Sequence, residues 1–143
     1  MRIKKILDFK KSCVAIACTL SLTVAMGISC FASTSTTFKV NNVSITGKIS
    51  YTDTNDYNPL AKDSVTAKTS AKASMDSISA TATIYYAEGS TIKTVKETAN
   101  NTNCTSCSVT AKSSSIGIGF RGVGNHGASH NGNSGSGTTG VNW

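Results

Sequence analysis

Strict alternation of side-chain type is the feature that most constrains how this chain can fold. In VSITGKISYT, residues 43–52, every second residue is apolar, aromatic or glycine, and the residues between them are Ser, Thr or Lys. Successive side chains of a β-strand point to opposite faces, so a period of two indicates a strand with one buried face. The segment 43–52 is therefore predicted to be a half-buried strand.

The same alternation continues through SVTAKTSAKASMD, residues 64–76, and SISATATIYY, residues 77–86. A helix is the rival interpretation of these Ala-rich segments, but it would mix the two sets of residues around its circumference, and Ser and Thr are poor helix formers. The apolar positions change phase between Met75 and Ile78. We therefore expect two strands separated by a bulge or tight turn at Asp76 and Ser77.

Four shorter segments complete the predicted strands, over residues 37–40, 91–98, 107–112 and 115–121. In the last one, Ile116, Ile118 and Phe120 are expected to face inward, while Gly117 and Gly119 leave the other face bare for another backbone. About seven short strands, with turn signals between most of them and no helical pattern after residue 32, predict an all-β fold. The expected architecture is a small antiparallel β-sandwich, Ig-like or similar.

The N-terminal segment has the pattern of a secretory signal peptide. Basic residues between positions 2 and 11 precede an apolar run over 13–31, and small residues at 30 and 32 favour cleavage after Ala32. An uncleaved membrane anchor and a lipid attached to Cys30 are the two alternatives. The predicted localisation is secreted, with membrane contact only through the signal peptide or that lipid.

The remaining chain divides into a β-sandwich domain, residues 33–121, and a tail, residues 122–143, that is nearly all Gly, Ser, Asn, Thr and His. Such a composition offers little apolar area to bury, so we expect the tail to be flexible. Removal of residues 1–32 takes away five of the 14 Lys and Arg and one of the 7 Asp and Glu, which leaves a net charge of +3. The remaining Lys residues are scattered and form no basic stripe with aromatic platforms, so nucleic acid is not an expected partner.

Two cysteines and two histidines have spacings that raise the question of a metal site. Cys104 and Cys107 form C-x2-C, and His126 and His130 form H-x3-H after eighteen intervening residues. Zinc sites of this class usually have twelve to fifteen residues there, and a redox pair commonly needs a helix N-terminus. We expect a local disulfide between Cys104 and Cys107, with two free thiols as the alternative, no metal on His126 or His130, and no cofactor.

Catalytic patterns are weak in this sequence. Asp53, Asp56 and Asp63 cluster in one segment, but their order matches no calcium loop, and a solvated loop is the favoured interpretation. His126 has no strand-turn-helix context that would expose a serine nucleophile to it. The sequence therefore predicts a non-enzymatic binding or structural module with an unknown extracellular or cell-envelope partner. The alternative is a small antimicrobial, bacteriocin-like or toxin-like protein that engages an envelope through its tail and Trp143.

Overall fold

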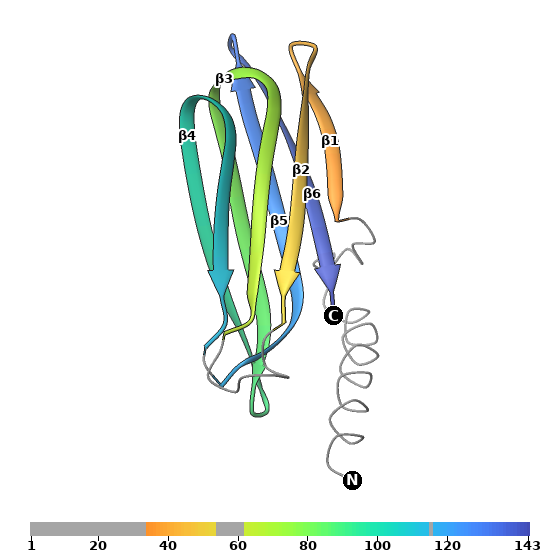
Figure 1. Ribbon diagram of the computed structural model, residues 1–143, viewed down its shortest axis with the longest axis vertical. Coiled ribbons are helices and arrows are strands. Elements are labelled where there is room, and N and C mark those ends of the chain that lie inside the picture. The colour runs from red at the N-terminus through yellow and green to blue at the C-terminus, as the bar shows by residue number, and fades with distance from the viewer. Residues whose placement is uncertain (1–33, 54–61, 115) are drawn as a thin grey trace. The chain divides into compact units, whose positions relative to one another are not determined.

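A computed structural model describes residues 34–53, 62–114 and 116–143 of the chain, and the described part is all-β (Figure 1). No helix is present among these residues, and so none that is long and apolar enough to cross a membrane. The expected signal peptide lies outside the described residues, as does most of the loop expected over 53–63. The six strands are β1 (Ser35–Val40), β2 (Val43–Thr52), β3 (Ser64–Glu88), β4 (Thr91–Lys112), β5 (Ile118–His130) and β6 (Asn133–Asn142).

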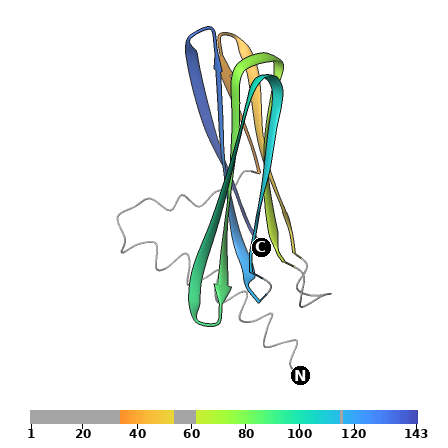
Figure 2. The ribbon, with the colours of Figure 1, turned by 90° about the vertical axis from the view of Figure 1, so that its left-hand side faces the viewer.

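The strands form one antiparallel sheet that is nearly closed, seen from two directions in Figures 1 and 2. Its order is β1-β2-β3-β5-β6, and β4 pairs with β3 off this path. β3 therefore has three partners. Its N-terminal part pairs with β2, from Ser64 to Ala71, and its C-terminal part pairs with β5, from Ser77 to Ala87.

β3 and β4 form one long hairpin that is bent in the middle. Both ribbons fold over at the upper end of Figure 1. The β3–β4 register shifts between Ser70 and Met75, and Asn103 on β4 has a φ of 52°, a left-handed value that Asn tolerates better than most residues. Burial of both Met75 and Ile78 confirms the predicted change of phase, but the bulge predicted at Asp76 and Ser77 is misplaced, because the register is regular from Met75 onward and shifts before it. The expectation of separate strands is wrong, because pairing resumes beyond the irregularity and each strand continues.

Most of the predicted inward positions of β2 and β3 are confirmed, but Tyr51 at the end of β2 and Ala73 at the bend of β3 are exposed. The core of the sheet consists of alternate residues of these strands together with contributions from β1, β4 and β5, and it includes Ile45, Ile49, Val65, Ala67, Met75, Ile78, Ala80, Ala82, Ile84 and Tyr86. Tyr86 is buried and Tyr85 lies on the opposite face, where the Arg121 guanidinium carbon is 5.4 Å from its ring centroid. The period-two pattern therefore identified the buried face of both strands.

Glycines on the inner face receive large side chains from facing strands. A Cβ at Gly47 of β2 would lie 2.3 Å from Cγ of His126 on β5, and one at Gly122 of β5 would lie 2.7 Å from a methyl of Val65 on β3. Real Cβ atoms do not approach this closely, so only glycine fits here without a shift of the neighbours. Strands that pair with different parts of β3 thus come together across the interior.

The orientation predicted for residues 115–121 is wrong. Ile116 and Ile118 are 70% and 37% exposed, whereas Gly117 and Gly119 are buried. A Cβ at Gly117 would lie 2.3 Å from the Tyr86 ring. Side chains such as Tyr86 and Trp143 fill the interior space beside these glycines. The glycines therefore face inward, and Ile116 and Ile118 face outward.

The expectation of a flexible tail is not met in the described residues. Positions 122–142 lie largely within β5 and β6, joined by a turn in which Asn131 and Gly132 have positive φ. The composition argument failed because glycine buries no side chain of its own but makes room for one. Gly135 and Gly137 of β6 lie beside Phe38 of β1, where a Cβ would come within 3.1 Å of its ring.

Candidate functional site

Cys104 and Cys107 both lie on β4, and both are free thiols. Cys107 is 2% exposed and pairs with Thr69 of β3, whereas Cys104 is half-buried and pairs with Met75. The predicted Cys104–Cys107 disulfide is thus not formed, and the two thiols lie along one strand rather than on facing strands.

His126 is the most buried titratable ring in the described part of the chain, with 1% of its surface exposed. Its Nδ1 lies 2.9 Å from Oγ1 of Thr69, and its Nε2 lies 2.8 Å from Oγ1 of Thr139. Both ring nitrogens are therefore occupied by threonine hydroxyls from β3 and β6. The ring also fills the space beside Gly47, where a Cβ would lie 2.3 Å from its Cγ.

The partners of His126 assign its tautomer. The Thr69 hydroxyl donates to the carbonyl oxygen of Ser79 at 2.6 Å, so it can only accept from the histidine. Nδ1 must then carry the proton, and Nε2 accepts from the Thr139 hydroxyl. Burial lowers the pKa of His126 to about 4, because a charged ring would lose its hydration. The imidazole is neutral at physiological pH and is a structural element of the interior.

His130 lies at the end of β5, away from these threonines. Its Nδ1 is 3.5 Å from Oδ1 of Asp76 but makes no hydrogen bond, whereas its Nε2 lies 3.3 Å from the side-chain nitrogen of Asn131. The other oxygen of Asp76 accepts a hydrogen bond from the backbone N–H of Asn131 at 2.7 Å. The adjoining β1–β2 turn is held by Asn41, whose amide donates to the His130 carbonyl at 2.7 Å. These contacts connect the β1–β2 turn at Asn41, the β5–β6 turn at Asn131 and the bend of β3 near Asp76.

The four residues with zinc-type spacing are not brought together as a ligand set. Over residues 34–53, 62–114 and 116–143, no group of three or more His, Cys, Asp or Glu could hold a metal ion. Of the acidic cluster, Asp56 lies outside the described residues. Asp63 is fully buried and accepts a hydrogen bond from the backbone N–H of Gly119 at 2.7 Å, so it is not the solvated side chain that was expected.

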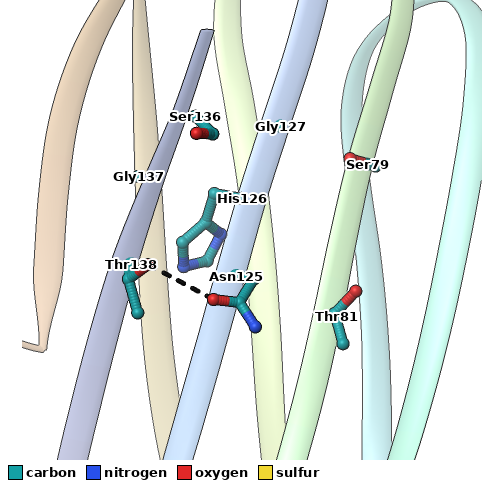
Figure 3. A pocket seen from close by; sticks show the side chains of 8 residues that line it. All are labelled: Ser79, Thr81, Asn125, His126, Gly127, Ser136, Gly137 and Thr138. Atoms are coloured by element: carbon teal, nitrogen blue, oxygen red, sulfur yellow. Dashed lines mark hydrogen bonds between the residues drawn. The ribbon is translucent and has the colours of Figure 1, made fainter. Parts of the chain in front are cut away.

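A shallow groove of about 280 Å³ crosses β3, β5 and β6 on the outer face of the sheet (Figure 3). It is lined by Ser79, Thr81, Asn125, His126, Gly127, Ser136, Gly137 and Thr138. The side chains that point into or over it are hydroxyls and one amide, since the His126 ring is directed to the interior. Gly127 has no side chain, and this keeps the floor of the groove low between the walls.

Hydrogen bonds hold the groove walls in place. Oγ1 of Thr138 donates to Oδ1 of Asn125 at 3.2 Å, which leaves the amide nitrogen of Asn125 directed away from β6 (Figure 3). Oγ1 of Thr81 lies 3.0 Å from Oγ1 of Thr98 on β4. The walls are therefore partly fixed before a ligand arrives, which reduces the entropy that binding would cost.

The sequence reasoning did not identify the groove. Its residues alternate with buried ones, as in SISATAT and NSGSGTTG, residues 77–83 and 133–140. A pattern search for hydroxyl residues on the outward phase would have found the two walls. The pairing that sets β3 and β6 on either side of β5 is long-range and left no such signal. Comparison of the chain with protein-family models, with curated proteins and with solved structures gives no match.

Proposed function

We propose that the protein is a secreted, non-enzymatic binding module that acts at or outside the cell surface, and that its binding site is the groove across β3, β5 and β6. The observation that carries this proposal is the groove itself, a concave site on which polar groups from three strands converge. Secretion rests on the signal-peptide pattern of residues 1–32.

The finer architecture that we propose is a small β-sandwich. The contact of Gly47 with His126 joins β2 and β5, which are not hydrogen-bonded to each other, and that of Gly122 with Val65 joins β5 to the N-terminal part of β3, with which β5 does not pair; two packed layers require such contacts. Strand pairing gives an Ig-like arrangement no specific support, since β3 and β4 each continue through a bend rather than ending there.

A non-enzymatic role is supported by the position of the candidate general base. His126 is buried and both ring nitrogens are bonded to threonine hydroxyls, so neither nitrogen is open to a ligand in the groove. The antimicrobial alternative gains no specific support. Trp143, on which it partly depended, stacks on Tyr51 with ring centroids 4.5 Å apart and an interplanar angle of 9°.

Sedimentation with insoluble envelope material tests the proposal. Protein purified from the culture medium of an expressing bacterium is mixed with washed bacterial cell walls, and the bound fraction is measured across wall concentrations. Gly127→Val places a branched side chain on the groove floor, where even a Cβ would lie 2.6 Å from the Ser79 hydroxyl. We expect wall affinity to fall by roughly tenfold, equivalent to about 1.4 kcal/mol.

Ser108→Val is the matched control. Ser108 is exposed on β4 opposite Lys68, on a part of β3 that does not line the groove. Thermal unfolding verifies that both variants are folded. Equal binding of the wild type and Gly127→Val would contradict the proposed site, and absence of the protein from the medium would contradict secretion.

A further inference from the structure

The side chains of the groove walls are uncharged, and each can both donate and accept hydrogen bonds. Ser79 and Thr81 contribute hydroxyls from β3, Ser136 and Thr138 contribute them from β6, and Asn125 contributes an amide from β5. A hydroxyl is both a donor and an acceptor, and an amide carries both functions on separate atoms. A partner for these walls must therefore also present donors and acceptors together.

Charged and purely apolar ligands match the groove poorly. The lining contains no Asp, Glu, Lys or Arg side chain, whereas anions are usually held by Arg or Lys and cations by carboxylates. Arg121 is the one Lys or Arg of β5, and its guanidinium lies over the Tyr85 ring. An apolar ligand would strip water from five polar side chains without replacing their hydrogen bonds.

The free bonding capacity is on the atoms that face outward. The Thr138 hydroxyl is used by the Asn125 oxygen, so the amide N–H groups of Asn125 remain available as donors at the centre of the groove. The Ser79 and Ser136 hydroxyls, one on each wall, make no side-chain hydrogen bond to another described residue. Gly127 lies between them, and its bare backbone allows a flat ring to approach.

We propose that the groove binds a neutral, hydroxyl-rich chain, which is the chemistry of an uncharged extracellular carbohydrate. This inference rests on the proposed binding function and names its ligand class. The volume of about 280 Å³ is at the lower end for a ligand pocket and suits one or two sugar rings. For so small and open a contact, the dissociation constant is expected to be on the order of 1 mM.

Nuclear magnetic resonance titration of the 15N-labelled secreted protein tests the proposal. The probes are neutral hexasaccharides of glucose, N-acetylglucosamine, galactose and mannose, each added to 10 mM, and a heparin hexasaccharide as the charged probe. We expect at least one neutral probe to shift the amide signals of residues 125–127 and 136–138. Its affinity should be unchanged between 50 and 500 mM salt, because no charge is paired.

Asn125→Ala should lower the affinity for that neutral probe by roughly five- to tenfold, the loss expected when a well-placed hydrogen bond is removed. Thr110→Ala is the matched control, because Thr110 forms a similar cross-strand pair with Thr66, Oγ1 to Oγ1 at 2.7 Å, away from the groove. If no neutral probe shifts these signals while wall binding still depends on Gly127, the ligand class is wrong and the binding site stands. A response to heparin alone would overturn the inference in the same way.

If neither the probes nor the walls respond to changes at Gly127 and Asn125, the proposed function itself is wrong. Neutral-probe shifts confined to other strands would likewise remove the groove as the site. Both proposals would be supported if a neutral probe shifts the groove signals and its affinity falls in Asn125→Ala but not in Thr110→Ala.

Discussion

Acidification should destabilise this protein through one side chain, His126. Its ring is buried, and its neutral form satisfies both nitrogens with Thr69 and Thr139. Protonation would add a second N–H where Nε2 now accepts a hydrogen bond, and it would place a charge in the interior. The perturbation that we consider is a change from pH 7 to pH 4.5.

The sign and size of the effect follow from the lowered pKa of His126. The pKa is about 4 in the folded protein and 6.5 in an unperturbed histidine. Between these values the unfolded chain binds more protons than the folded one, so stability falls as the pH decreases from above 6.5 towards 4. At about 1.4 kcal/mol per pKa unit, the complete loss is about 3 kcal/mol, and about 2 kcal/mol is lost by pH 4.5. A domain of this size is commonly stable by about 5–15 kcal/mol, so the effect is measurable.

Urea unfolding at pH 7 and pH 4.5, followed by the fluorescence of Trp143, measures the change. His126→Gln keeps one donor and one acceptor without a titrating group, and we expect its pH-dependent loss to be smaller than that of the wild type by about 2 kcal/mol. Carboxylates titrate in both proteins and cancel in this comparison. Thr110→Ala, which leaves His126 and its partners intact, is the control and should show the pH dependence of the wild type.

Equal pH dependence of His126→Gln and the wild type would refute this reasoning. If His126→Gln does not fold at pH 7, the imidazole of the wild type can be titrated directly by nuclear magnetic resonance. A measured pKa of His126 above 6 would then show that burial does not suppress its protonation.

Two further predictions concern the interior and the thiols. Gly47→Ala should lower the free energy of unfolding by about 1–3 kcal/mol in urea, because the new Cβ would meet the His126 ring at 2.3 Å. An unchanged free energy of unfolding would contradict the packing argument. The thiols of Cys104 and Cys107 should both react with a thiol reagent once the protein is denatured without reductant. In the folded protein Cys107 should be protected from the reagent, because it is 2% exposed. A mass two daltons below that of the reduced chain would show a disulfide instead.

The buried face of β2 and β3 could be predicted because its signal is local. Each inward position carries an apolar side chain or lies between two of them, so the period of two is visible within ten residues. The same argument located the change of phase after Met75. Nothing local indicated that β3 continues past this point, because continuation depends on β4 pairing along both parts.

The glycine-rich C-terminal strands could not be predicted in the same way. The evidence that Gly122 and Gly137 are inward is the presence of Val65 and Phe38 across the interior, more than fifty residues away in the chain. His126 was identified from its ligand type, but its role is decided by Thr69 and Thr139 on two other strands. Long-range pairing likewise assembles the groove, so its residues appeared unremarkable in the sequence.

The continuous β3–β4 hairpin has a consequence for the order of folding. Its turn closes between Glu88 and Thr91, so pairing can begin from contacts that need no long loop to close. β2 then pairs with β3 up to Ala71, and β5 pairs with it from Ser77 onward. The β1–β2 and β5–β6 hairpins therefore do not compete for the same stretch of backbone and can dock in either order. The β3–β4 hairpin thus provides the pairing edges for both parts of the sheet. A backbone cut at its turn would slow the docking of the β1–β2 and β5–β6 hairpins at once.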